Sequence, residues 1–283
     1  MSKYAHIAIV TDCGDLDEMR YRVTAQRLFF PHAVRVSFCA TESLNTLHAG
    51  FVGATHVVAE INRSGRLKEG EFIGLLVNAA PRLGREGGRP LRGENRQTAG
   101  EAICALLLQS GVWVVGPNAG LNFYFLQKEV RESFLVADPS GQRTPFRSNY
   151  VMMPALAQIF DPHQGSRIRL EPKALPPIEA EPGLFVGGQD SHGNLYIAST
   201  RPDERWVPPV GESRALFIGD HGPVRIRRFD GIFAGNTGDL ALTTGSLELP
   251  DGRPVYYIVR VGGHAAPSLG HPRPGAKIRL ERE

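Results

Sequence analysis

The sequence predicts an α/β N-terminal domain with a central, mostly parallel sheet, followed by a smaller all-β domain. Apolar runs typical of buried strands alternate with helical patterns up to residue 160, which indicates a sheet covered on both faces. Beyond residue 183, short strand patterns follow one another without helices, which favours a small barrel or sandwich. The Pro-rich segment 161–183 between these regions is predicted to be an interdomain linker.

Apolar spacing predicts the elements of the N-terminal domain, residues 1–160, in chain order. Strands are expected at 7–10, 33–39, 70–77 and 112–115. Helices are expected at 19–30, 43–62, 121–130 and 150–160. Residues 99–108 have helical propensity without an assigned role, and the Gly- and Arg-rich stretch 82–93 is predicted to be a loop.

The C-terminal domain, residues 184–283, is predicted from short apolar runs punctuated by Gly and Pro. Strands are expected at 184–186, 195–198, 215–218, 224–229, 239–243, 256–261 and 277–280.

Composition excludes several classes of protein. A net charge of +3 is too small to indicate nucleic-acid binding. No apolar run is long enough to span a bilayer, and the N-terminus does not have the pattern of a signal peptide. The three cysteines are odd in number and widely spaced, so they form neither a disulfide framework nor a metal motif. A cytoplasmic protein is therefore predicted.

The polar residues that follow the first strand form the first candidate site. Asp12 comes directly after the apolar run 7–10 and before a helical pattern. In open α/β sheets, ligands bind at the carboxyl ends of strands, where a carboxylate can accept hydrogen bonds from sugar hydroxyls. The alternative interpretation is that Asp12 caps the following helix.

Four strand-end motifs together resemble one known family. Thr11-Asp12-Cys13-Gly14 is similar to its T-D-F-G, and residues 115–121 are similar to its V-G-P-D-N-G-L. Residues 190–195 are similar to its D-x-F-G-N-L, and 263–270 with Gly275 are similar to its G-S-A-A…L-G…G-D. The family is the S-adenosylmethionine hydroxide adenosyltransferases, which includes the fluorinase and chlorinase enzymes.

The resemblance implies a fold, an assembly and a reaction. The fold would be an N-terminal α/β domain and a C-terminal β-barrel, in a homotrimer whose ligand site lies between domains of neighbouring subunits. S-adenosyl-L-methionine would be the substrate or ligand. A nucleophile would attack the ribose C5′, and neutral methionine would leave, so aligning and desolvating the nucleophile would contribute most. Neither a metal nor a redox cofactor is expected.

The resemblance also implies ligand-binding roles, residue by residue. Asp12 would bind the ribose hydroxyls and Asn194 the adenine edge, while Asp190 and Ser246 would hold the methionine ammonium. Phe233 would pack on adenine, and the backbone at Arg260 and Gly262 would meet it. The plainer alternatives are a turn residue for Asn194, a polar turn for Ser246 and a core residue for Phe233.

The departures from the family concern the reaction centre. Asn78 stands where hydroxide-using members carry an Asp, and Arg147 stands where they carry a His. Either Arg85 or Arg89 could match the family's catalytic Arg. Because an amide cannot act as a carboxylate base and Arg stays protonated, water chemistry by the family's route is not expected.

The halide-using members are not matched either. Ser148 and Phe146 are retained, but Asn45 replaces an indole, Asn78 a Tyr and Pro81 a Thr. A pocket with these asparagines, Arg147 and Ser148 would be polar and cationic, and would suit an anionic or carbonyl-bearing co-substrate. The alternative is that Arg147 pairs with an acid, namely Glu94, Glu101 or Asp138.

The predicted function is therefore that of an S-adenosylmethionine-dependent transferase whose nucleophile is neither water nor halide. The candidate catalytic residues are Asn78, Arg147 and Ser148. Two alternatives stay open: a different reaction of specialised metabolism on a larger substrate, and a non-catalytic module that binds an adenosyl ligand.

Overall fold

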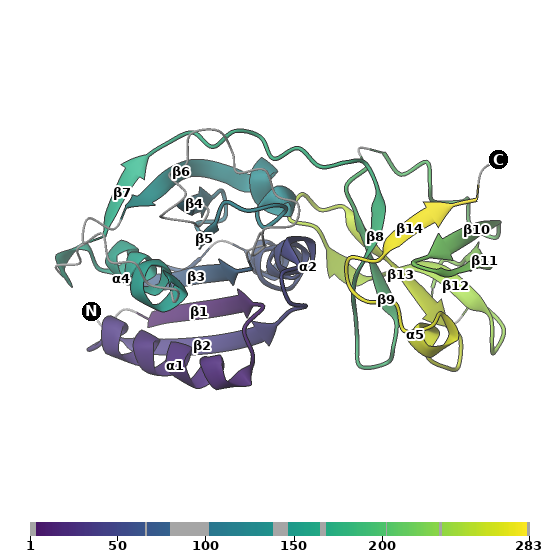
Figure 1. Cartoon of the computed structure of the whole chain (residues 1–283), viewed down its shortest axis with the longest axis horizontal. Helices are drawn as coiled ribbons and strands as arrows, with labels where there is room; N and C mark the ends of the chain where they lie inside the picture. The colour runs from purple at the N-terminus through teal and green to yellow at the C-terminus, as the bar shows by residue number, and fades with distance from the viewer. Residues whose placement is uncertain are drawn as a thin grey trace, which may run out of the picture. The chain divides into compact units, whose positions relative to one another are not determined.

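The computed structural model describes residues 4–65, 67–79, 102–137, 147–164, 168–201, 203–231 and 234–281. The chain divides into two compact units, Met1–Ile178 and Glu179–Glu283 (Figure 1). The boundary between them falls inside the segment predicted as a linker. Part of that segment is not a linker, because Arg169–Pro172 forms strand β7 and pairs with β6 at the edge of a sheet.

The first unit contains one seven-stranded sheet with helices packed on it. Its strands are β1 (Tyr4–Thr11), β2 (Ala33–Ala40), β3 (Glu71–Asn78), β4 (Ile103–Leu108), β5 (Trp113–Pro117), β6 (Val130–Ala137) and β7. Its α-helices are α1 (Asp15–Phe29), α2 (Thr46–Val52), α3 (Ala59–Ser64) and α4 (Met153–Phe160). Its other helical turns are η1 (Gly53–Val58), η2 (Tyr124–Glu129), η3 (Ser148–Met152) and η4 (Pro162–Gln164).

The prediction of an α/β domain with a central, mostly parallel sheet is wrong. The described residues are mostly β, and the strand order is β2-β1-β3-β5-β4-β6-β7. The neighbours from β2 to β5 pair in parallel, whereas β4, β6 and β7 pair antiparallel. The sheet is therefore mixed.

Strand β4 is the main reason for this difference. Residues 99–108 have helical propensity, yet Ile103–Leu108 is a strand in which every residue is buried. A short apolar run buried on both faces has no periodicity that distinguishes a strand from a helix. Only four residues separate β4 from β5, which is too short for the crossover that a parallel pair requires. The pair is consequently an antiparallel hairpin.

Helices cover both faces of the parallel half of the sheet. On one face, α1 and α4 contribute Phe29 and Phe160, whose ring centroids lie 5.3 Å apart, to a core that includes Leu76. On the other face, Gly53 of η1 packs against Leu75 and Val77. The alternation of side chains along β3 thus places helical segments on opposite sides of the sheet.

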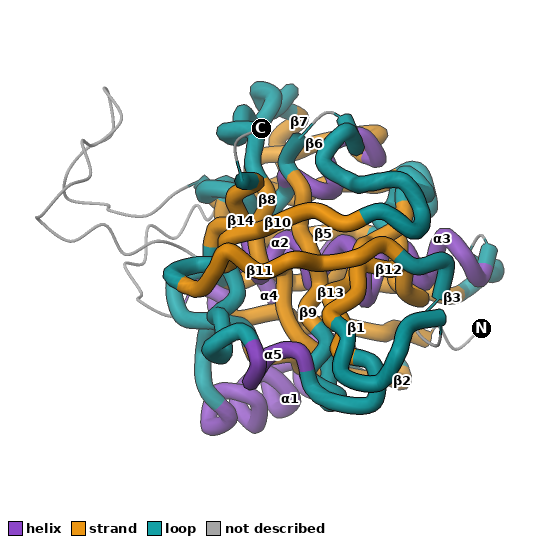
Figure 2. Tube along the Cα trace, turned by 90° about the vertical axis from the view of Figure 1, so that its right-hand side faces the viewer, coloured by secondary structure: helices purple, strands orange, loops and turns teal. Residues whose placement is uncertain are grey.

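The second unit is a closed seven-stranded barrel in its described part (Figure 2). Its strands are β8 (Leu184–Gln189), β9 (Leu195–Ser199), β10 (Ser213–Ile218), β11 (His221–Arg228), β12 (Leu240–Glu248), β13 (Pro254–Arg260) and β14 (Lys277–Leu280), and its one described helix is α5 (Ala265–Ser268). The order around the barrel is β10-β11-β12-β13-β9-β8-β14. Inward-facing residues such as Ile197, Leu216 and Ile258 form its core.

Within the described ranges, the structure contains no helix that is both long enough and apolar enough to cross a membrane.

A close contact between α2 and the loop after β5 generates a prediction on stability. A Cβ atom at Gly50 would lie 2.3 Å from the backbone oxygen of Leu121. We expect Gly50→Ala to lower the free energy of unfolding by about 1–3 kcal/mol, because the backbone must shift to accommodate the methyl group. Urea unfolding measures this change. Gly231→Ala is the control, since no atom lies within 4 Å of a Cβ there, and an equal effect of both substitutions would contradict the prediction.

Candidate functional site

The carboxyl ends of β1 and β3 meet at the point where the strand order reverses. The chain leaves β1 toward β2 on one side and returns to β3 on the other. The register pairs Thr11 with Asn78, so the last residues of the two strands lie at the same level. β1 and β3 belong to the parallel half of the mixed sheet, and ligands bind outside the carboxyl ends of parallel strands at such a switch point. This geometry makes the residues that follow β1, together with Asn78 at the end of β3, the candidate site.

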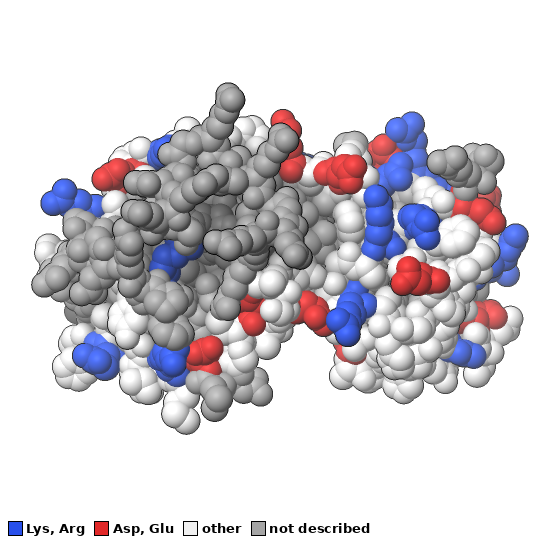
Figure 3. All heavy atoms as spheres, in the orientation of Figure 1, with Lys and Arg blue, Asp and Glu red and all other residues white. Residues whose placement is uncertain are grey.

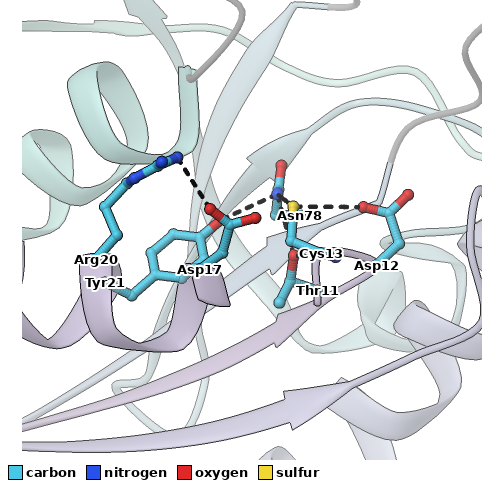
Figure 4. A network of polar contacts seen from close by, with 7 residues as sticks. All are labelled: Thr11, Asp12, Cys13, Asp17, Arg20, Tyr21 and Asn78. Carbon is cyan, nitrogen blue, oxygen red and sulfur yellow. Dashed lines mark hydrogen bonds and ion pairs between the residues drawn. The ribbon is translucent and has the colours of Figure 1, made fainter. Parts of the chain in front are cut away.

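The amide of Asn78 is the centre of a polar cluster at this end of the sheet (Figure 4). Its Nδ2 atom donates to Thr11 Oγ1 at 3.1 Å and to Tyr21 OH at 3.0 Å, and it lies 3.4 Å from Cys13 Sγ. Thr11 Oγ1 also accepts the backbone N–H of Cys13 at 3.1 Å. The cluster therefore connects β1, α1 and β3 through side chains.

Tyr21 is buried beneath this cluster, with 1% of its surface exposed. Burial raises the pKa of its hydroxyl to about 12, while hydrogen bonds with Ser148 and Thr11 partly oppose the shift. Ser148, at the start of η3, is itself 7% exposed. The structure thus brings the two predicted residues Asn78 and Ser148 to the same tyrosine hydroxyl.

Asp12 does not cap α1, so the alternative interpretation of this residue is wrong. The N-cap of α1 is Gly14, which provides no side-chain bond. Instead, Asp12 Oδ2 accepts the backbone N–H of Leu44 at 3.0 Å, and Oδ1 lies 4.0 Å from Cys13 Sγ. The carboxylate therefore connects the end of β1 to the loop that precedes α2.

That loop has a strained backbone. Leu44 has a φ of +60°, a left-handed conformation that bulky residues rarely adopt, and 43% of its surface is exposed. Asn45 Oδ1 caps α2 by accepting the N–H of His48 at 2.9 Å. The ring of His48 accepts the N–H of Glu42 at 3.0 Å, and burial lowers the pKa of His48 to about 4. Asn45 consequently has a structural role in α2.

Arg147 is half-buried and directly precedes η3, next to Ser148. Several residues that the sequence associates with this region lie outside the described residues, and so do the acids proposed as partners of Arg147. They are Phe146, Pro81, Arg85, Arg89, Glu94, Glu101 and Asp138.

Predicted residues of the second unit meet in the turn between β8 and β9. Asp190 Oδ1 accepts the backbone N–H groups of His192 and Asn194, both at 2.9 Å, and Oδ2 accepts the side-chain amide of Asn194 at 2.9 Å. Asn194 is therefore a turn residue whose side chain is bonded to the Asp190 carboxylate, and its contact with an adenine edge stays a prediction. One N–H of its amide is already used by Asp190.

A tyrosine pair connects Asp190 with Ser246. The rings of Tyr196 and Tyr257 lie 4.8 Å apart, and burial together with the Asp190 charge raises the pKa of Tyr196. Tyr257 is hydrogen-bonded to Ser246, which partly opposes the burial that raises its pKa. Sequence reasoning missed both tyrosines, because aromatic residues in strands are usually core. Phe233 lies outside the described residues.

The loop after β13 packs against the Asp190 turn. The Nδ1 atom of His264 lies 2.7 Å from the carbonyl oxygen of His192. The carbonyl oxygen of Gly193 accepts the N–H of Ala266 at 2.9 Å. Arg260 contacts Ser268 through its guanidinium. Gly262 has a φ of +70°, which favours glycine. The loop that contains Gly262 and the turn that contains Asn194 are therefore neighbours.

Charged side chains of both signs are mixed on the one face of the second unit that is in view (Figure 3). Within the described parts of the chain, no group of three or more His, Cys, Asp or Glu side chains could hold a metal ion.

Comparisons with known proteins support the fold and give no information on the function. No family model and no curated protein matches the chain. A crystal structure of an uncharacterized conserved protein from Thermotoga maritima is 14% identical, with a TM-score of 0.62 over 97% of this chain and 100% of that one. A conserved hypothetical protein from Thermus thermophilus is 18% identical, with a TM-score of 0.57 over 99% and 100%. At these identities the similarity shows the fold alone.

The raised pKa of Tyr21 generates a prediction on pH dependence. The hydroxyl has a pKa of about 12 in the folded chain and about 10 when unfolded. Between these values the unfolded chain releases its proton first, so the contribution of Tyr21 to stability, about 2–3 kcal/mol, is present below pH 10 and is lost toward pH 12. We expect Tyr21→Phe to be less stable than the unmodified protein at pH 8, by about 1–2 kcal/mol, with the difference narrowing above pH 10 and changing sign toward pH 12.

Urea unfolding at each pH provides the measurement. Tyr4→Phe serves as the control, because 43% of the Tyr4 surface is exposed. A stability difference for Tyr21→Phe that stays constant from pH 8 to pH 12 would count against the assigned environment of this hydroxyl.

Proposed function

We propose that this protein is an S-adenosyl-L-methionine-dependent transferase, similar to the hydroxide adenosyltransferase and halogenase enzymes, that displaces methionine at the ribose C5′. Its nucleophile would be neither water nor halide. The proposal includes the homotrimer and the cytoplasmic location predicted from the sequence.

The observation that carries the proposal is the placement of Asp12 and Asn78 at one switch point. Asp12 follows β1 and Asn78 ends β3, at one level of the sheet, and the carboxyl ends of parallel strands at a switch point are positions where ligands bind. Asp12 holds the loop before α2 through Leu44, yet a carboxylate can accept further hydrogen bonds from ribose hydroxyls. In the second unit, the bonded pair of Asp190 and Asn194 provides polar groups that would suit the same type of ligand.

The identity of residue 78 supports the choice of nucleophile. An Asn in place of a carboxylate cannot remove a proton from water. Its Nδ2 atom is within hydrogen-bonding distance of Thr11 and Tyr21, so the polar cluster differs from the apolar shell that would strip water from a halide. Water and halide chemistry are therefore both disfavoured at this position.

Ligand binding is the first prediction from this proposal. We expect Asp12→Ala and Asn194→Ala each to weaken binding of S-adenosylmethionine by about 1–3 kcal/mol, because each substitution leaves polar groups of a buried ligand unpaired. Isothermal calorimetry gives the affinities, and thermal unfolding verifies that the variants are folded. Glu60→Ala is a matched control, since that carboxylate forms an ion pair with Arg63 at 3.1 Å in α3, which contributes no residue to the candidate site. Unchanged affinity in both site variants would remove the proposed nucleoside site.

Turnover is the second prediction. We expect negligible conversion of S-adenosylmethionine to adenosine and methionine, since general-base assistance typically contributes about 10²–10⁴-fold to rate. Asn78→Asp combined with Arg147→His is expected to increase adenosine production. Chromatography of overnight reactions measures both products. Robust adenosine formation by the unmodified protein would show that another group activates water, and binding without methionine release under any condition would favour the non-catalytic alternative.

A further inference from the structure

The outward face of α1 exposes large apolar side chains. Met19, Val23 and Phe30 are 73%, 50% and 77% exposed, and Phe30 is the residue that ends the helix. Their spacing of four and seven residues places all three on one side of the helix, away from the core residues Tyr21 and Phe29. In Figure 1, α1 lies outside β1 and β2, and no described element of the first unit covers its outward side. The helix therefore has two apolar faces, and the core of the first unit uses one of them.

An open depression lies on this outward face, in the last two turns of α1. Val23, Gln26, Arg27 and Phe30 line it. The lining combines two apolar side chains with an amide and a guanidinium, so it can hold an apolar group and hydrogen-bond acceptors at the same time. Aromatic residues, Met and Arg are enriched in protein–protein interfaces, whereas Lys, Glu and Asp are depleted there. The outward face of α1 thus has the composition of an interface with another protein.

The charge beside this face is positive. Between residues 19 and 41 the sequence contains four arginines and neither Asp nor Glu. Arg20 and Arg22 form ion pairs with acids in the first turn of α1, at 2.9 and 2.6 Å. Arg27, in the depression, forms no ion pair with any residue that the structure describes. A partner with carboxylates would therefore find a cation that is available at this position.

The same features disfavour two other occupants. Arg20 and Arg27 are seven residues apart and so lie on the same side of the helix. Two copies of this chain docked α1 to α1 would bring these guanidinium groups together, and like charges across an interface are unfavourable. A helix that binds a bilayer buries its apolar face among the lipids. Gln26 lies between Val23 and Phe30, so its amide would be buried there without a hydrogen-bond partner.

We propose that the outward face of α1 docks an acidic amphipathic helix of another protein. Apolar side chains of that helix fill the depression and cover Met19 and Phe30. Carboxylates beside its apolar stripe pair with Arg27, and its polar groups bond to the amide of Gln26. The packing of one amphipathic helix against another is a recurrent mode of recognition. The docking does not depend on the S-adenosylmethionine function proposed above, because these side chains point away from the candidate site at Tyr21 and Asn78.

Three synthetic helical peptides of equal length test the chemistry of the partner on the full-length protein. The first has a Leu stripe bordered by Glu, the second has Lys in place of each Glu, and the third has Ala in place of each Leu. Fluorescence anisotropy measures the Kd of each peptide. We expect the Leu–Glu peptide to bind at least about tenfold more tightly than either of the others, a difference of about 1.4 kcal/mol. Equal binding of all three peptides, or no binding of the Leu–Glu peptide, would overturn the inference.

Variants of α1 locate the surface that binds. We expect Val23→Ser and Phe30→Ser each to raise the Kd of the Leu–Glu peptide by about fivefold or more, since apolar anchors dominate such interfaces. Val210→Ser is the matched control, because Val210 is an exposed apolar residue of the second unit. We expect Arg27→Glu to weaken binding of the Leu–Glu peptide and to strengthen binding of the Leu–Lys peptide. Thermal unfolding verifies that each variant is folded, and an equal effect of Val210→Ser would contradict the assignment to α1.

The two disfavoured occupants are tested with the same variant. Light scattering compares the molar mass of Phe30→Ser with that of the unmodified protein, and sedimentation with phosphatidylglycerol vesicles measures lipid binding by both. We expect equal molar masses and no sedimentation with vesicles. A lower molar mass of Phe30→Ser would show that α1 covers a second copy of this chain. Vesicle binding that Phe30→Ser abolishes would show a lipid surface, and either result would overturn the docking of an acidic helix.

Discussion

The parallel pairing of β1 with β3 is the constraint on which the candidate site depends. Eight consecutive residues of each strand are in register, from Tyr4 with Glu71 to Thr11 with Asn78. Because the register does not shift, both strands end at one level of the sheet. The backbone N–H of Asp12 then donates to the carbonyl oxygen of Asn78 at 3.1 Å, which extends the ladder into the loop.

Polar groups buried at this strand end must satisfy one another. A buried hydroxyl or amide without a partner costs about 1–3 kcal/mol, and Thr11, Tyr21 and Asn78 avoid that cost by sharing hydrogen bonds. A cluster in which each group depends on its neighbours has few alternative arrangements. It therefore fixes side-chain direction more firmly than apolar packing would, and side-chain direction determines which atoms face a ligand.

Sequence reasoning located strands better than it predicted their connections. All seven strands expected after residue 183 lie wholly or largely within strands of the barrel, because alternation and Gly or Pro punctuation are local signals. The mixed sheet was not predicted, because a fully buried run such as Ile103–Leu108 has no apolar periodicity that identifies it as a strand. Strand β6 was missed because Val130–Ala137 follows η2 with no residue between them that marks a boundary.

The candidate site shows the same limit. Asp12 is a candidate because it follows a predicted strand, and Asn78 is a candidate because of the family resemblance. The inward direction of the Asn78 nitrogen depends on Tyr21, which is 57 residues away in the chain and has the spacing of an ordinary core residue of a helix. The function of Asn45 as a cap for α2 likewise depends on where that helix begins, at Thr46 and not at residue 43.

The left-handed backbone of Leu44 has a consequence for the thermodynamics of recognition. The neighbouring residues hold this conformation through the Asp12 carboxylate and the His48 ring, so the loop loses its conformational entropy when the chain folds. A ligand that arrives later meets a loop that is already ordered and does not bear that entropic cost. The affinity of a ligand for this preorganised loop would depend on the contacts that the two make. Association is expected to be fast, because the loop does not have to fold first.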